Sequence, residues 1–135
     1  MTGRPSIARH TVMIGRLKTR RDFLAAAQGS KAARRAFVLE ARQRGDDASP
    51  RFGFTVTKRT ARKAVERNRI RRRLREVARL ASADARAGHD YVLVGRRFAL
   101  TATFADLAAM LGEALRQTAA SPNSGRESTS RSDRR

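Results

Sequence analysis

The sequence predicts a single small α+β domain, in which helices pack on a mixed β-sheet, and three observations support that class. The 135 residues suffice for one hydrophobic core and are too few for two. Hydrophobic residues make up 40% of the chain, a share typical of globular proteins. Segments with helix and strand patterns alternate in the order α-β-β-α-β-α, without an internal repeat.

The first half of the domain is predicted to hold one helix and two strands. The helix spans Arg20–Gln28, with Asp22 near its start and Gly29 as its stop. The strands are Ala36–Arg42 and Arg51–Lys58, and a turn-forming segment separates them. We therefore expect these two strands to pair as a hairpin.

The second half is predicted to be helix, strand and helix. The apolar period becomes helical from Ala61 and stays so until Gly88. A buried strand, Tyr91–Val94, comes next, and then a helix with Thr103 as N-cap and Asp106 in the reciprocal capping position. The folded domain is expected to cover residues 16–117, between a flexible basic arm (residues 1–15) and a disordered Ser/Arg tail (residues 118–135).

The helix that starts near Ala61 has one apolar and one polar face. The apolar face holds Ile70, Leu74, Val77, Ala78 and Ala81, and the opposite face holds Asn68, Arg72, Arg75 and Arg79. The first face is predicted to pack on the core and the second to face solvent or a partner.

Positive charge is concentrated on this part of the chain. The sequence has 31 Lys and Arg against 12 Asp and Glu, a formal net charge of +19. Residues 51–80 alone carry 12 Lys or Arg and two Glu, and six arginines fall within positions 67–75. Because solvated helix faces normally mix both signs, we interpret this helix as a site for a polyanion, and for nucleic acid in particular. If about six phosphates are neutralised, log K should fall against log salt with a slope of about −4 to −5.

Other classes of function lack the residues that they need. There is no cysteine, which excludes disulfides and thiolate metal sites. His10 lies in the arm and His89 is interpreted, with Asp90, as part of a turn, so a two-histidine nuclease is a poor candidate. The carboxylates form no cluster that would bind Mg²⁺. No apolar run approaches the ~18 residues of a membrane span, and no secretory signal is visible, so we expect a cytoplasmic protein without a membrane partner.

The strand segment RFGFTV permits two interpretations. Phe52, Phe54 and Val56 share one face, so the ordinary expectation is that both rings belong to the core. The Phe-Gly-Phe pattern also resembles, in part, the stacking platform of an RNA-recognition motif, and that interpretation requires both rings to be exposed.

The segment K-R-x-x-R-K-A-x-E-R-N-R-I-R-R-R-L-R-E, residues 58–76, resembles the protein component of bacterial ribonuclease P, whose hallmark is an Arg-Asn-Arg helix after a Gly-containing strand. The resemblance extends from about Arg16 to Leu115 and includes R-L-K-x-x-x-D-F, F-V-L, G-F-T-V-T-K-R and D-Y-V-L-V. It implies an α-β-β-β-α-β-α fold, an arrangement shared with a domain of a small-subunit ribosomal protein. In that fold the Arg-rich helix makes a left-handed crossover, against the usual right-handed rule. One more strand is therefore expected than the residue patterns show.

The resemblance also implies a function and a set of site residues. The family's catalytic subunit is RNA, and the protein helps it to bind precursor tRNA and the Mg²⁺ needed to remove the 5′ leader. One protein per RNA is expected, with Mg²⁺ held by the RNA and no metal site on the protein. The residues that the motif assigns to RNA contact are Lys58, Arg59, Arg67, Asn68, Arg69, Arg71, Arg72 and Arg75, and those assigned to the leader cleft are Phe23 and Phe54.

Three positions depart from the family pattern. Ala27 and Glu40 stand where family members often carry aromatic residues, and Arg73 stands where an apolar residue is common. The alternative interpretation is a basic ribosomal-type RNA-binding protein without a role in cleavage, which would bind RNA with no dependence on a 5′ leader.

Overall fold

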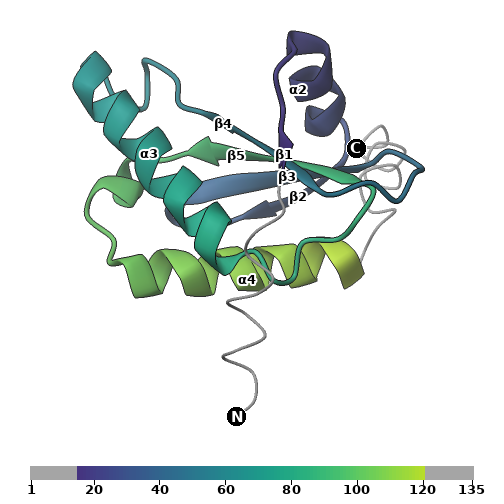
Figure 1. Cartoon of the computed structure of the whole chain (residues 1–135). Coiled ribbons are helices and arrows are strands. Elements are labelled where there is room, and N and C mark those ends of the chain that lie inside the picture. Colours follow the sequence, from purple (N-terminus) through teal and green to yellow (C-terminus); the bar gives the residue numbers. More distant parts are fainter. Residues whose placement is uncertain (1–14, 121–135) are drawn as a thin grey trace, which may run out of the picture.

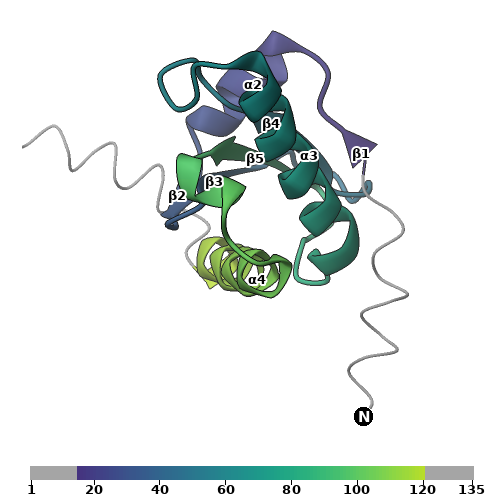
Figure 2. The same ribbon diagram turned by 90° about the vertical axis from the view of Figure 1, so that its left-hand side faces the viewer.

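The computed structural model describes residues 15–120, which form a five-stranded mixed sheet with helices on both faces. α2 covers one face, whereas α3 and α4 cover the other (Figure 1, Figure 2). The elements in chain order are β1 (Gly15–Arg16), α2 (Arg20–Ala27), β2 (Ser30–Ala33), β3 (Phe37–Gln43), β4 (Arg51–Thr55), α3 (Ala64–Ala81), β5 (His89–Gly95), the 3-10 helix η1 (Arg97–Leu100) and α4 (Phe104–Ala120). No helix within these residues is long and apolar enough to cross a bilayer. The predicted arm lies outside the described residues except for residue 15, and the tail does so from residue 121.

The strand order is β1-β4-β5-β3-β2, so the predicted hairpin of β3 and β4 is wrong. β5 lies between these two strands, antiparallel to β3 and parallel to β4. Most residues of β5 are buried, and a strand that is buried on both faces belongs at the centre of a sheet, with a neighbour on each side. β4, α3 and β5 thus form a parallel crossover unit through the Arg-rich helix.

Two of the strands are not predicted by the residue patterns. β2 pairs antiparallel with β3 at one edge of the sheet, and it is the additional strand that the family resemblance implied. Its sequence, Ser-Lys-Ala-Ala, has little intrinsic preference for a strand. β1 has only two residues and pairs in parallel with β4. Both strands are formed because a neighbouring strand offers its free hydrogen-bonding edge, which no local pattern reveals.

The main core lies between the sheet and the helices α3 and α4. The predicted apolar face of α3 is confirmed, because Ile70, Leu74, Val77 and Ala78 are buried and Ala81 packs beside them. The four residues predicted on the opposite face of α3 are all exposed. The helical period of the apolar residues therefore predicted correctly which face of α3 packs against the sheet.

The start and end of α3 differ from the prediction. The helix begins at Ala64, not at Ala61, and it ends at Ala81, well before the predicted stop. Its late start has a local cause. The Oγ1 atom of Thr57 accepts a hydrogen bond from the backbone N–H of Thr60 at 3.2 Å, which stabilises a turn ahead of the helix.

A second, smaller core lies under α2. Leu17, Ala26 and Val92 are buried there, and Phe23 packs against them. α2 occupies the predicted segment to within one residue. Its N-cap is Thr19, whose Oγ1 accepts a hydrogen bond from the third helical residue at 3.1 Å.

α4 closes the main core, and its predicted N-cap, Thr103, is confirmed. The backbone N–H of Asp106 donates to Oγ1 of Thr103 at 3.0 Å. The leucines on the inner face of α4 are buried. The helix extends to Ala120, so the predicted domain boundary at Gln117 falls within its last turn.

Candidate nucleic-acid interface

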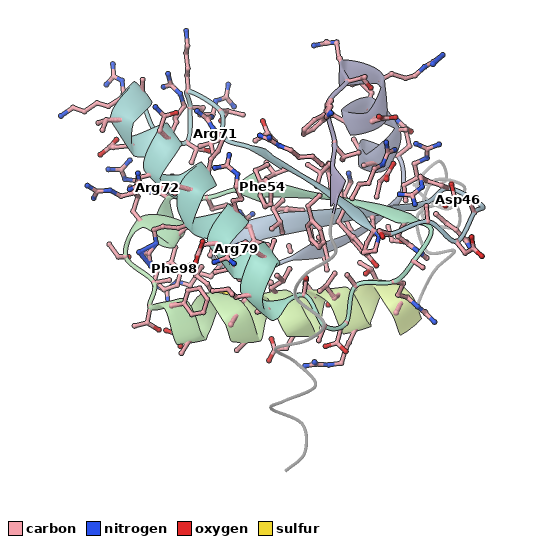
Figure 3. The ribbon with its side chains drawn as sticks, viewed as in Figure 1. Asp46, Phe54, Arg71, Arg72, Arg79 and Phe98 are labelled. Carbon is pink, nitrogen blue, oxygen red and sulfur yellow. The ribbon has the colours of Figure 1, made fainter. Side chains whose placement is uncertain are left out.

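α3 presents most of the predicted RNA-contacting side chains to solvent. Asn68, Arg69, Arg72 and Arg75 are exposed, and Lys58 and Arg59 are exposed in the turn before the helix. Figure 3 shows long basic side chains extending from the N-terminal half of α3, where Arg71 and Arg72 are labelled. The arrangement is a ridge of guanidinium groups that stands on the sheet and is held there by its buried apolar face.

Arg67 differs from the other predicted contacts, because the protein itself uses its guanidinium. The Nη1 atom of Arg67 donates to the backbone carbonyls of Ala61 at 2.9 Å and Arg62 at 2.8 Å. Lys63, at the N-cap position of α3, makes no side-chain capping hydrogen bond. Arg67 therefore holds the turn against the start of the helix, a positioning role that sequence reasoning did not find. A second link within the ridge joins Arg71 Nη2 to Asn68 Oδ1.

A groove runs along β4 between α2 and α3. Its first part has a volume of about 780 Å³, and its lining includes Arg16, Phe54 and Arg75. Its second part has a volume of about 470 Å³, and its lining includes Phe23 and again Phe54. Lys18 also lines both parts, so the two hollows adjoin each other. We call the whole feature the β4 groove.

The two Phe rings of β4 have different environments. Phe52 is only 1% exposed, whereas Phe54 is half-buried, and the rings stack with centroids 6.3 Å apart and an interplanar angle of 13°. The guanidinium carbon of Arg75 lies 5.8 Å from the centroid of Phe54. Phe52 thus belongs to the core, and the interpretation as an RNA-recognition motif, which needs both rings exposed, is wrong.

Phe23 reaches the β4 groove from α2 because β4 has a glycine opposite it. A Cβ atom on Gly53 would lie 2.5 Å from Cζ of Phe23, far inside van der Waals contact. Glycine at this position lets the Phe23 ring lie directly on the strand. Glu40, at a position where family members often carry an aromatic ring, also lines the groove, and its carboxylate accepts a hydrogen bond from Lys31 at 3.1 Å. The structure therefore brings the two predicted cleft residues, Phe23 and Phe54, to one groove.

Comparison with known proteins identifies the family of this chain. A family model described as Ribonuclease P matches residues 14–119, which is most of the chain. The chain belongs to the ribonuclease P protein family. The ribonuclease P protein component of Caulobacter vibrioides is 50% identical over 91 residues, covering 66% of this chain and 60% of that protein. The corresponding protein of Brucella suis is 38% identical over 125 residues, covering 86% of this chain and 88% of that protein.

Solved structures of ribonuclease P proteins have the same fold. The protein from Staphylococcus aureus superposes with a TM-score of 0.62 at 28% identity, over 76% of this chain and 94% of that one. The protein from Thermotoga maritima superposes with a TM-score of 0.62 at 29% identity, over 73% of this chain and 92% of that one. The predicted α+β fold of this ribonuclease P protein is confirmed, and the family assignment favours the main interpretation over the ribosomal-type alternative.

The prediction that His89 and Asp90 lie in a turn is wrong, because both residues belong to β5. Asp90 is the second residue of β5, and its side chain is completely buried. Its Oδ1 accepts hydrogen bonds from Arg44 Nη1 at 2.6 Å and Arg51 Nε at 2.8 Å, and its Oδ2 accepts one from Arg51 Nη2 at 2.9 Å. Arg42 Nη1 lies 3.5 Å from Oδ2. Asp90 thus ties three neighbouring strands together at one end of the sheet.

The electrostatics of this cluster follow from two opposing effects. Burial raises the pKa of the Asp90 carboxyl, but hydrogen bonds from Arg51 and Arg44 outweigh it and hold the pKa below its usual range. Asp90 is therefore charged, and its arginines serve the fold. Within residues 15–120, no group of three or more His, Asp or Glu side chains lies close enough to bind a metal ion together.

Proposed function

We propose that this chain is the protein subunit of ribonuclease P, which binds the catalytic RNA and precursor tRNA and promotes endonucleolytic removal of the 5′ leader. The observation that carries the proposal is the β4 groove, because it combines aromatic side chains with cations along the flank of an arginine helix. Such a site suits a substrate that has a single-stranded segment next to a structured one.

The β4 groove suits a single-stranded leader. Single strands bind where aromatic rings stack against bases and cations follow the backbone. Phe23 and Phe54 supply the rings, whereas Arg16, Lys18 and Arg75 supply the cations. Among residues 15–120, Glu40 is the one carboxylate that lines the groove, and its bond to Lys31 offsets its charge.

The outer face of α3 suits the phosphate backbone of structured RNA. The exposed guanidiniums of Arg69 and Arg72 offer planar, paired donors to phosphate, and Asn68 adds a neutral donor and acceptor. Bound phosphates would offset the repulsion among these like charges. The protein would then act by holding two RNAs in register, which lowers the entropic cost of bringing the substrate to the catalytic centre.

The hydrolytic chemistry is assigned to the RNA in this proposal. RNA phosphates would hold the Mg²⁺. One protein would bind each RNA, and the complex would act in the cytoplasm. The protein's contribution would be greatest at low Mg²⁺, where its cations replace the metal ions that otherwise screen the two RNAs from each other.

The test is cleavage of a precursor tRNA at low Mg²⁺ by a bacterial ribonuclease P RNA, with and without this protein. We expect the wild-type protein to restore cleavage and the Arg72→Gln/Arg75→Gln variant to restore about tenfold less. The matched control is Arg86→Gln/Arg116→Gln, which removes the same charge from exposed positions outside the β4 groove and α3. If the wild-type protein binds the RNA but does not stimulate cleavage, the proposal fails and a ribosomal-type role replaces it.

The leader contact has its own test. Phe23→Leu keeps an apolar side chain on the small core but removes the aromatic face, so we expect it to weaken binding of a substrate with a leader. The same variant should leave the affinity for mature tRNA, which has no leader, unchanged. Equal affinities of wild type and variant for the substrate with a leader would remove Phe23 from the contact.

A further inference from the structure

A second basic surface lies on the other flank of α3, where the β2–β3 turn meets η1. Arg35 comes from that turn, and Arg96 and Arg97 follow β5. All three are exposed, and Arg69 of α3 lies one helical turn from Glu66, which binds Arg97. We call this surface the η1 corner, defined by Arg35, Arg69, Arg96 and Arg97. None of these residues lines the β4 groove.

The η1 corner is separated from the β4 groove by the body of α3. Figure 3 shows Phe54 and Phe98 on opposite sides of this helix. On a helix with 3.6 residues per turn, Arg69 and Arg75 point to different flanks, about 120° apart. A single RNA strand in the groove therefore does not cover the corner, and the corner's charges are left for another RNA segment.

The cations of the corner are held in place by the fold. The guanidinium of Arg35 lies over the ring of Phe98, with its central carbon 4.0 Å from the centroid. Arg96 donates from Nη1 to the carbonyl of Arg34 at 2.8 Å. Arg97 binds the carboxylate of Glu66 at 3.1 and 3.3 Å. Because the side chains are already ordered, less conformational entropy is lost when they bind a ligand.

The net charge of the corner is positive despite its single acid. Arg97 lowers the pKa of Glu66 through its hydrogen bonds, so Glu66 is charged and neutralises one of the cations. The corner then has four guanidiniums and one carboxylate. Arg34, the next cation along the β2–β3 turn, does not add to this surface, because it donates to Gln117 at 2.8 Å and lies 3.6 Å from Glu113.

The chemistry of the corner fits phosphates better than bases. Phe98 is the aromatic residue of the corner. Because the guanidinium of Arg35 lies over its ring, that face of the ring is not available to stack on an unpaired base. A surface of ordered guanidiniums without a free ring recognises a backbone by its charge and shape. Helical RNA presents such a backbone, whereas a single strand is better bound in the β4 groove.

We infer that the η1 corner is a second RNA-binding surface, and that it contacts the phosphate backbone of a helical segment of the catalytic RNA, independently of the leader. The inference rests on the proposed function, because it takes the ribonuclease P RNA as the partner. It assigns Arg35, Arg96 and Arg97 to RNA contact, and it places this contact apart from the groove that is proposed to bind the leader.

The test compares two double variants that remove the same charge. Arg35→Gln/Arg97→Gln changes the corner, and Arg86→Gln/Arg116→Gln is the control. Arg97 and Arg116 are alike, at 59% and 61% side-chain exposure, each in one ion pair. Arg86 precedes β5 and Arg96 follows it, so the seven residues of that strand separate these two arginines by about 20 Å.

The measurement is binding of the full-length protein to a bacterial ribonuclease P RNA over a series of salt concentrations. We expect the corner variant to bind about tenfold more weakly at moderate salt, with a log K against log salt slope smaller by about 1.8, the value for two lost phosphate contacts on a duplex. The control should change affinity less than twofold. Arg35→Lys/Arg97→Lys, which restores the charge, should recover most of the affinity.

Each other outcome contradicts the inference. Equal loss in the corner and control variants would show that only the net charge matters, and would leave an acidic protein surface as the candidate partner of the corner. If the lysine variant did not recover binding while its unfolding temperature matched wild type, phosphate recognition by charge would be refuted. If the corner variant also reduced the affinity ratio between precursor tRNA with and without a leader, the corner would belong to the substrate path. If wild-type protein did not bind the RNA, the proposed function itself would fail first.

Discussion

Replacing Asp90 by Asn should strongly destabilise the domain, because Asp90 is a fully buried carboxylate held by two arginines. The substitution keeps the size of the side chain and removes its charge. One carboxylate oxygen becomes an NH₂ group that faces guanidinium donors. The neighbouring Arg44 has a side chain that is only 9% exposed, so its charge stays largely desolvated without its best partner.

The magnitude follows from the contacts that are lost. The carboxylate accepts three hydrogen bonds of 2.6 to 2.9 Å, and each hydrogen bond to a charged group contributes about 1.5 to 3 kcal/mol. The amide keeps part of these bonds, and Arg44 keeps its bonds to Asp46 and to backbone carbonyls. We expect a loss of about 3 kcal/mol in the free energy of unfolding, at the lower end of what breaking a buried ion pair costs. For a domain of this size, that is a fall in Tm of about 10 °C or more.

The assay is equilibrium unfolding in urea at several pH values. The folded pKa of Asp90 lies below its unfolded value, so its stabilising contribution is complete above about pH 5 and is lost as the pH falls through the folded pKa. Asp90→Asn should therefore cost most at pH 7, and the difference from wild type should shrink below about pH 4. Asp84→Asn, which removes an exposed ion pair with Arg116, is the control and should cost less than about 1 kcal/mol. Equal stability of Asp90→Asn and wild type at pH 7, or a difference that does not depend on pH, would refute the reasoning.

Three further predictions concern the core, the groove and a helix cap. Leu74→Ala should lower the free energy of unfolding by about 2 to 5 kcal/mol in urea unfolding, because Leu74 is completely buried on the inner face of α3; a loss below about 1 kcal/mol would show that the site is not packed. Gly53→Ala should push Phe23 off β4, since the added Cβ would lie 2.5 Å from its ring. It should weaken binding of a precursor tRNA with a leader, with mature tRNA as the control, and an unchanged leader dependence would argue against Phe23 as a contact. Thr103→Ala removes the hydroxyl that accepts from the backbone of Asp106 and should cost about 1 kcal/mol in thermal unfolding, whereas Thr103→Ser should cost little.

The local elements could be predicted because their signals are local. The helical period of Ile70, Leu74 and Val77 identified both the existence of α3 and its buried face, since a helix can only bury one stripe of side chains. The cap at Thr103 was equally visible, because a capping hydroxyl acts on a backbone group three residues away. The family resemblance predicted one additional strand, β2, which the residues of that segment do not indicate by themselves.

The sequence predicted which face of α3 would carry exposed arginines, because charge density and helical period are properties of the sequence. The contact of these arginines with RNA stays a prediction. The role of Arg67 was not found, because its bonds to Ala61 and Arg62 depend on where the turn before α3 places those carbonyls. The role of Asp90 was not found either, because its three arginine partners lie about 40 or more residues away in the sequence, in β3, just after β3 and in β4.

The sequence alone determined that this chain is one α+β domain, that α3 carries its charge on one face, and that its partner is a polyanion. These are consequences of composition and period, which involve neighbours along the chain. Only the tertiary structure decided that β5 lies between β3 and β4, that Phe52 is core while Phe54 lines a groove, and that cations from the β2–β3 turn and η1 gather on the far flank of α3. Strand order and convergence of distant side chains are set by long-range packing, in which each strand is placed by the neighbours that bury it and not by its own residues.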